Sequence, residues 1–193
     1  MKTFLFKPFE KYSEKSLFLI GSIFTLIGSF VAHTFNTRFD GVFDIHITAN
    51  SLFSQTLVDN IINIFCLLFF LYLSAICINK KTRLIDILTT AMIARIPLYL
   101  VSLMNSNAII SKATEDIIQL TNSKLLHQIP SSSLFVITVY GIITILFLIW
   151  YVSLLLNGFK VASNAKGKVS VILFSISLLF AEILSKFLIF QLN

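Results

Sequence analysis

Three ionisable side chains stand inside otherwise apolar stretches of the sequence, and they are the first candidates for chemistry. Arg95 lies in one apolar run, and Glu182 and Lys186 lie four residues apart in another. If these runs cross a membrane, each charge is costly there, so it either pairs with another group or lines a path for an ion or a proton. The three residues therefore support two hypotheses, a structural ion pair and a polar pathway.

The composition places these residues in a membrane protein. Of the 193 residues, 56% are hydrophobic and only 12% are charged, whereas soluble domains carry about 25% charged residues. Five apolar runs are long enough to cross a hydrocarbon core about 30 Å thick as helices. The runs are continuous and do not alternate, which favours helices over barrel strands. We predict an all-α bundle of five transmembrane helices at about residues 17–35, 58–78, 84–104, 134–156 and 169–190.

The distribution of Lys and Arg between the spans predicts the orientation. Ten of these residues lie in the arm at residues 1–16 and in the second–third and fourth–fifth connections, against three in the other two connections. Cytoplasmic loops accumulate Lys and Arg, so the N-terminus is predicted inside and the C-terminus outside. The clusters form no single basic stripe, which argues against nucleic-acid binding. The ten are Lys2, Lys7, Lys11, Lys15, Lys80, Lys81, Arg83, Lys160, Lys166 and Lys168, and the three are Arg38, Lys112 and Lys124.

Two segments outside the spans are amphipathic. The cytoplasmic arm mixes Phe4, Phe6 and Phe9 with lysines, which suits an anionic inner leaflet. The connection between the third and fourth spans repeats apolar residues at helical spacing, and we predict an amphipathic helix that lies on the outer interface or caps the bundle. Its apolar residues are Ile109, Ile110, Ala113, Ile117, Ile118 and Leu125, opposite Lys112, Glu115, Asp116 and Gln119.

The topology brings two of the intramembrane charges to similar depth. Arg95 follows Leu84 by eleven residues and Glu182 follows Val169 by thirteen, so in two spans that run in the same direction their depths differ by only about 3 Å. We therefore predict an Arg95–Glu182 ion pair that fixes the register between helices. Lys186 shares the helix face of Glu182 and either competes for that carboxylate or extends towards the outer surface.

Other residues of the spans predict how the helices pack. Pro97 removes a hydrogen bond to the carbonyl of Ile93 and should kink the third span near its middle. Gly21, Thr25 and Ser29 form a stripe of small residues that serves either packing inside the bundle or dimerisation. Two asparagines of the second span are expected to hydrogen-bond across helices: Asn60 and Asn63.

No pattern typical of catalysis or metal binding is found. The sequence has no His-Glu-x-x-His, Gly-x-Ser-x-Gly or Walker motif. The two cysteines, Cys66 and Cys77, lie eleven residues apart on one predicted helix, too far for a mutual disulfide. We expect no enzymatic activity, no cofactor and no metal site. The histidines are dispersed over the outer segments at His33, His46 and His127.

Three motifs spread along the chain resemble the YIP1 family of small five-span membrane proteins. They are Phe6-Lys7-Pro8-Phe9 before the first span, residues 90–97 (Thr-Ala-Met-Ile-Ala-Arg-Ile-Pro) in the third, and Asn157-Gly158-Phe159-Lys160 with Ala162 and Lys166-Gly167 after the fourth. The resemblance implies a five-span fold with the N-terminus inside, and no catalytic residues. The chain lacks the acidic-Leu-x-Gly-Pro motif of eukaryotic members, so their contact with small GTPases is not carried over.

These observations give a leading function and one alternative. The leading expectation is a non-enzymatic membrane protein of the YIP1 type that acts through helix packing, oligomerisation, membrane organisation or trafficking-like scaffolding. Its expected partners are the lipid bilayer and other copies or other membrane proteins. The alternative is a small transporter or channel subunit that uses Arg95, Glu182 and Lys186 beside the Pro97 kink. The abundance of Phe, Ile, Asn and Lys indicates an AT-rich genome and a bacterial cytoplasmic membrane.

Overall fold

The computed structural model describes residues 6–122 and 129–192 and is helical except for one short two-stranded ribbon. Lys2, Phe4, Lys124, Leu125 and His127 lie outside the described residues. The helices are η1 (Pro8–Glu10), α2 (Glu14–Thr34), α3 (Phe53–Ile78), α4 (Leu84–Ala94), α5 (Ile96–Ser102), η2 (Leu103–Ala108), α6 (Ile109–Asn122), α7 (Ser131–Ser163) and α8 (Lys168–Leu192), and the strands are β1 (Thr37–Arg38) and β2 (His46–Ile47).

Five helical segments of the described chain are long and apolar enough to cross a membrane, which confirms the prediction of an integral membrane protein. They are α2, α3, the segment that begins with α4 and α5, α7 and α8. The first begins at Glu14, before the predicted start, because the Ser13 hydroxyl accepts a hydrogen bond from the Ser16 amide (3.3 Å) and caps the helix. The fourth has 33 residues and continues past the predicted end at residue 156.

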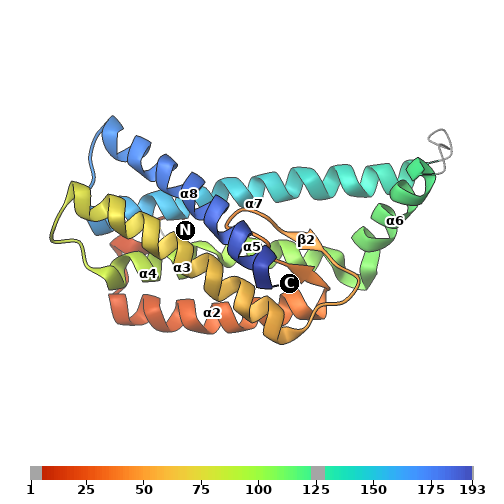
Figure 1. Cartoon of the computed structure of the whole chain (residues 1–193), viewed down its shortest axis with the longest axis horizontal. Helices are drawn as coiled ribbons and strands as arrows, with labels where there is room; N and C mark the ends of the chain where they lie inside the picture. The colour runs from red at the N-terminus through yellow and green to blue at the C-terminus, as the bar shows by residue number, and fades with distance from the viewer. Residues whose placement is uncertain (1–5, 123–128, 193) are drawn as a thin grey trace.

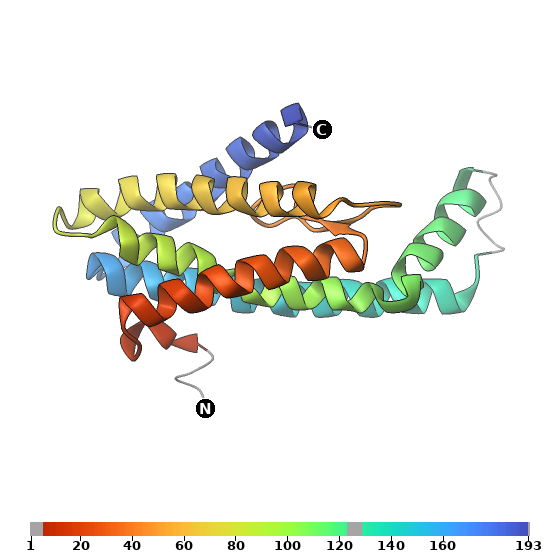
Figure 2. The same ribbon diagram turned by 90° about the horizontal axis from the view of Figure 1, so that it is seen from below.

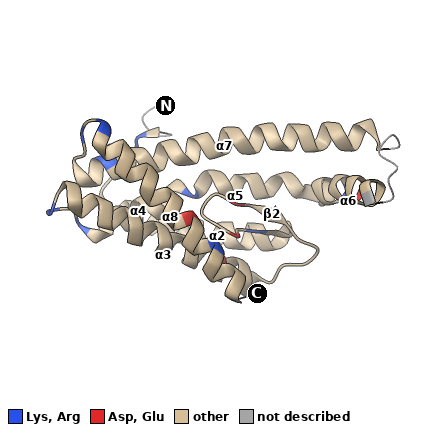
Figure 3. Ribbon diagram, turned by 45° about the horizontal axis from the view of Figure 1, so that its top comes forward, with Lys and Arg blue, Asp and Glu red and all other residues tan. Residues whose placement is uncertain are grey.

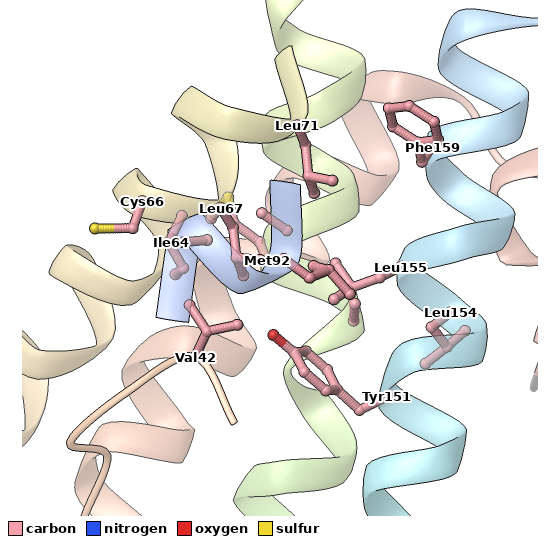
Figure 4. Close-up of a cluster of buried hydrophobic side chains, with 14 of the residues drawn as sticks. Val42, Ile64, Cys66, Leu67, Leu71, Met92, Tyr151, Leu154, Leu155 and Phe159 are labelled. Carbon is pink, nitrogen blue, oxygen red and sulfur yellow. The ribbon is translucent and has the colours of Figure 1, made fainter. Parts of the chain in front are cut away.

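The α4–α5 segment is the centre of the bundle (Figures 1 and 2). It packs against α2, α3 and α7, and α8 packs on the far side of α3. Small side chains in α4 (Thr89, Thr90, Ala91 and Ala94) allow the neighbouring helices to approach closely, and all four are buried. Figure 4 shows the apolar core that results, in which Leu67 and Leu71 of α3 and Met92 of α4 meet side chains of α7.

The third span is interrupted where Pro97 predicted a kink. Helix α4 ends at Ala94 and α5 begins at Ile96, with Pro97 in its first turn. Proline has no amide hydrogen to donate, and the amides of Leu98 and Tyr99 both donate to the carbonyl of Arg95 (2.9 and 3.3 Å). The interruption places Arg95 at the junction of two short helices near the middle of the bundle.

The predicted cytoplasmic segments gather at one end of the bundle (Figure 3). Glu14 at the start of α2 forms an ion pair with Arg83 in the α3–α4 connection. Asn157 near the end of α7 donates a hydrogen bond to Glu10 of the N-terminal arm (3.2 Å). The described basic residues of these three segments therefore lie together, as an alternating topology requires.

Helix α6 occupies the segment for which we predicted an amphipathic helix. It packs mainly against the first part of α7, where the Ser133 hydroxyl donates to Asp116 (2.7 Å). Ile110 and Ala113 face inward, with 4% and 5% of their surface exposed, whereas Ile118 is 53% exposed. The position of α6 at a membrane interface stays a prediction.

Candidate functional site

A hairpin between α2 and α3 reaches into the helical bundle. Its strands β1 and β2 pair antiparallel, with Thr37 opposite Ile47 and Arg38 opposite His46. Residues 39–45 between the strands form the tip, and Phe39 and Val42 in this tip have no exposed surface. Figure 4 shows Val42 among the core residues, close to Ile64 of α3 and to the left of Tyr151. We call residues 37–47 the inserted hairpin.

Side chains from α3 and α8 bind the backbone of the inserted hairpin. Irregular backbone at membrane depth is tolerated only where its polar groups find partners within the protein. The Val42 amide donates to the Ser185 hydroxyl (3.2 Å) and the Phe43 amide donates to the Glu182 carboxylate (2.9 Å). On the opposite side, the Asn63 amide group donates to the Phe39 carbonyl (2.8 Å). These side chains form the hydrogen bonds to the backbone of the tip that a neighbouring strand would form in a larger sheet.

Arg95 is fully buried beneath the tip. Its Nε donates to the Asn60 side-chain oxygen (3.1 Å), and one Nη donates a long hydrogen bond to the Val42 carbonyl (3.5 Å). The guanidinium carbon lies 5.2 Å from the centroid of the Phe39 ring, a cation–π contact. The Asn60 amide nitrogen also donates to the Ser29 hydroxyl (2.8 Å), so one network joins α2, α3, α5 and the hairpin.

The predicted ion pair between Arg95 and Glu182 is not formed among the described residues. Glu182 pairs with Lys186 (3.2 Å) and holds the tip, and Lys186 also pairs with Asp44 of the hairpin (2.9 Å). The physical reason is the hairpin itself, because Val42 contacts both the guanidinium of Arg95 and the Ser185 hydroxyl of α8. Competition by Lys186 for the Glu182 carboxylate, one of the sequence-based expectations, does occur.

A buried ion pair holds the base of the inserted hairpin. Arg38 binds Asp59 in two parallel hydrogen bonds, Nε to Oδ2 (2.9 Å) and Nη2 to Oδ1 (2.8 Å). The side chains are 11% and 3% exposed. Sequence reasoning missed this pair, although Asp59 falls within the predicted second span and the criterion that selected Arg95 applies to it equally. The two parallel hydrogen bonds fix the orientation of the two side chains relative to each other, in addition to the attraction between their charges.

An open pocket of about 540 Å³ lies between the inserted hairpin and the last part of α8. Charged side chains of both signs line it, and they pair with each other: Asp40 with His46, and Asp44 with Lys186. Within residues 6–122 and 129–192, no group of three or more His, Cys, Asp or Glu side chains is placed to hold a metal ion. The Asp40–His46 pair lies within the hairpin, and the Asp44–Lys186 pair ties the hairpin to α8.

The pairing of His46 with Asp40 predicts a pH dependence. The hydrogen bond to Asp40 raises the pKa of His46 above its ordinary value, against an opposing effect of burial. A raised pKa in the folded state means that the stabilisation is complete below about pH 6.5 and is lost as pH rises through the folded pKa. We expect the thermal midpoint to fall between about pH 6 and about pH 8.5, and the fall to be smaller in His46→Gln. An equal fall in both proteins, measured in detergent, would contradict the assignment.

The stripe of small residues on α2 faces the interior of the bundle. Gly21 lies against Met92, and Gly28, two turns further on, lies against the Tyr99 ring. The hydroxyls of Thr25 and Ser29 donate to carbonyls one turn back, both at 2.8 Å, and both residues are buried. Of the two uses weighed for this stripe, the structure shows packing within the chain.

Several buried polar atoms around Arg95 have no hydrogen-bond partner among the described residues. They include Nη2 of Arg95 and the hydroxyls of Tyr99 and Tyr151. Both phenols interact electrostatically with Arg95, and their rings pack edge-on against Phe39 and Phe43 of the tip. The inserted hairpin thus covers a small group of polar atoms that includes one full positive charge.

Comparisons of the chain with protein-family models, with curated proteins and with solved structures gave no match.

Proposed function

We propose that the chain is a non-enzymatic integral membrane protein that acts through helix packing, association with itself or with other membrane proteins, and organisation of the bilayer. The main support is the inserted hairpin, which fills the centre of the bundle and engages its charges. Arg95 is 0% exposed, and Glu182 and Lys186 are bound to the hairpin. A solute pathway through the bundle needs Arg95 to be reachable from one side. The resemblance to the YIP1 family favours the same class.

Accessibility of the hairpin tip tests this proposal. We expect Val42→Cys to resist a membrane-impermeant thiol reagent in intact membranes, because Val42 has no exposed surface, and to react after denaturation. Ala49→Cys, in the exposed part of the same connection, is the matched control and should react at once. Both variants are made with Cys66 and Cys77 replaced by Ala. Rapid reaction of Val42→Cys in folded protein would contradict a closed bundle.

A gated transporter is the second candidate, and the unpartnered polar atoms around Arg95 favour it. Withdrawal of the tip would expose the guanidinium together with the hydroxyls of Tyr99 and Tyr151, a set of donors suited to an anion. The open pocket beside Lys186 already lies next to the hairpin. If the protein is a gated transporter, Val42→Cys should react in folded protein. An added anion that binds at Arg95 should then slow this reaction. The two candidates thus predict opposite results in one experiment.

We further propose that the basic end of the bundle faces the bacterial cytoplasm, with the C-terminus outside. The clustering of three Lys-rich segments at one end supports this orientation. In intact cells the impermeant reagent should label Ala49→Cys in the α2–α3 connection but not Lys166→Cys in the α7–α8 connection, although both positions are exposed. Labelling of Lys166→Cys alone would reverse the orientation.

A further inference from the structure

An apolar groove of about 250 Å³ opens on the side of the bundle between α2, the α4–α5 junction and α7. Its lining is almost entirely apolar and includes Leu17 and Phe24 of α2, Ile93 and Ile96 on either side of the helix break, and Trp150 and Leu154 of α7. The helix break at Arg95 lies between the two isoleucines, so Ile93 belongs to α4 and Ile96 to α5. Because the groove lies on membrane-spanning helices, the surrounding solvent is lipid.

A polar pocket adjoins the groove at the basic end of the bundle. It measures about 480 Å³ and shares Tyr12 and Leu17 with the groove. Its charged residues have both signs: Arg83 carries the positive charge, and Glu14 and Asp86 carry negative charges. Arg83 forms ion pairs with both carboxylates, and its two hydrogen bonds to Asp86 measure 3.0 and 2.8 Å.

We propose that the groove and this pocket together bind one phospholipid with a zwitterionic, amine-bearing headgroup. An acyl chain fills the groove, and the headgroup lies among the charged residues of the pocket. Its ammonium group is matched to the carboxylates of Glu14 and Asp86, and its phosphate to the guanidinium of Arg83. A purely anionic headgroup would face two carboxylates and one cation, which is the wrong balance of charge. This inference goes beyond the proposed function and does not depend on whether the hairpin moves.

The chain carries its own probe for this site, because Trp150 is its single tryptophan and lines the groove. The protein, purified in detergent micelles, is titrated with phosphatidylethanolamine that carries bromine atoms on its acyl chain. We expect saturable quenching of the tryptophan fluorescence. Brominated phosphatidylcholine and phosphatidylglycerol should bind about tenfold more weakly, because the first lacks ammonium hydrogens and the second lacks the positive charge.

Three variants separate the groove from the pocket. Ile96→Phe adds a ring inside the groove and should abolish saturable quenching. The matched control is Ile183→Phe in α8, where Ile183 is 66% exposed, and it should leave the quenching unchanged. Asp86→Asn leaves the groove intact and should reduce the preference for phosphatidylethanolamine over phosphatidylcholine several-fold. This third variant tests the site even if Ile96→Phe fails to fold.

Each outcome supports or overturns one part of the proposal. Quenching that rises linearly with lipid, without saturation, would overturn the site as a whole. Saturable quenching that Ile96→Phe leaves unchanged in folded protein would overturn the groove as its place. A preference for phosphatidylglycerol would overturn the assignment of the headgroup. None of these results changes the accessibility expected for Val42→Cys, so failure here is distinguishable from failure of the proposed function.

Discussion

Replacement of Asp59 by Asn should lower the free energy of unfolding by about 3–5 kcal/mol, the usual result of removing one partner of a buried ion pair. Asp59 is 3% exposed at its side chain and accepts both hydrogen bonds from Arg38. The neutral amide leaves the positive charge of the buried Arg38 guanidinium without a compensating negative charge. It also replaces one of the two acceptor oxygens with an NH2 group, which donates. The measurement is reversible unfolding in mixed detergent micelles.

Removing both charges should be less harmful than removing one. The double variant Arg38→Met, Asp59→Leu leaves no uncompensated charge, so we expect it to be more stable than Asp59→Asn. Lys7→Ala is the control for an exposed pair: Lys7 and Glu10 are 55% and 42% exposed at their side chains, and loss of their contact should have no measurable effect. If Asp59→Asn behaved like Lys7→Ala, the Arg38–Asp59 pair would not hold the hairpin.

Replacement of Gly28 by Ala should destabilise the protein by about 1–3 kcal/mol or more, as overpacking of a tight contact does. A methyl group at Gly28 would overlap the ring atoms of Tyr99, and that ring is buried against Phe39 of the inserted hairpin (5.6 Å between centroids). The overlapping atoms are Cγ, Cδ1 and Cδ2 of Tyr99, which lie close to the backbone and cannot move aside as the end of a flexible side chain can. The helices α2 and α5 must therefore separate.

Gly141→Ala is a matched control for this prediction. Gly141 is also helical, in α7, and a methyl group there would meet nothing within 4 Å. Alanine favours a helix over glycine by about 1 kcal/mol, so Gly141→Ala should be neutral or slightly stabilising. Equal losses in the two variants, compared by thermal unfolding in the same detergent, would show that contact with Tyr99 is not the cause.

The helical part of the fold was predictable because its signals are local. Continuous apolar runs predicted five spans, and the described part of the chain has five segments of that kind. Pro97 acts on its own helix, so its effect was visible in the sequence as well. Gly21, Thr25 and Ser29 of α2 were recognised as a stripe of small residues, although the sequence did not decide between its two uses.

The inserted hairpin was not predictable because its burial depends on partners far along the chain. Its strands have two residues each, too short for a period to show. Phe39, Val42 and Phe43 make the connection unusually apolar for an outer loop, and this was the available signal. Two of the hydrogen bonds that hold the tip come from residues more than 130 positions away, at Glu182 and Ser185.

The same hairpin explains why the predicted Arg95–Glu182 pair was wrong. Matching depth on two helices is necessary for an ion pair, but it says nothing about what lies between them. A segment counted as an outer loop binds both residues, through the Val42 carbonyl and the Phe43 amide. Arg95 consequently relies on Asn60 and on the ring of Phe39 in place of a carboxylate.

The position of the hairpin tip is the central claim, and a thiol cross-link tests it most directly. A Cβ atom at Gly41 would lie 2.8 Å from the carboxylate oxygens of Glu182, which is within one side-chain length of the Glu182 backbone, so a short bifunctional thiol reagent should cross-link Gly41→Cys with Glu182→Cys within one chain. The exposed position Asn50, as Asn50→Cys with Glu182→Cys, should not. Both pairs are placed in a chain whose Cys66 and Cys77 are replaced by Ala, and the product is read by mass spectrometry. Cross-linking through position 50 and none through position 41 would place the tip outside the bundle and contradict the account.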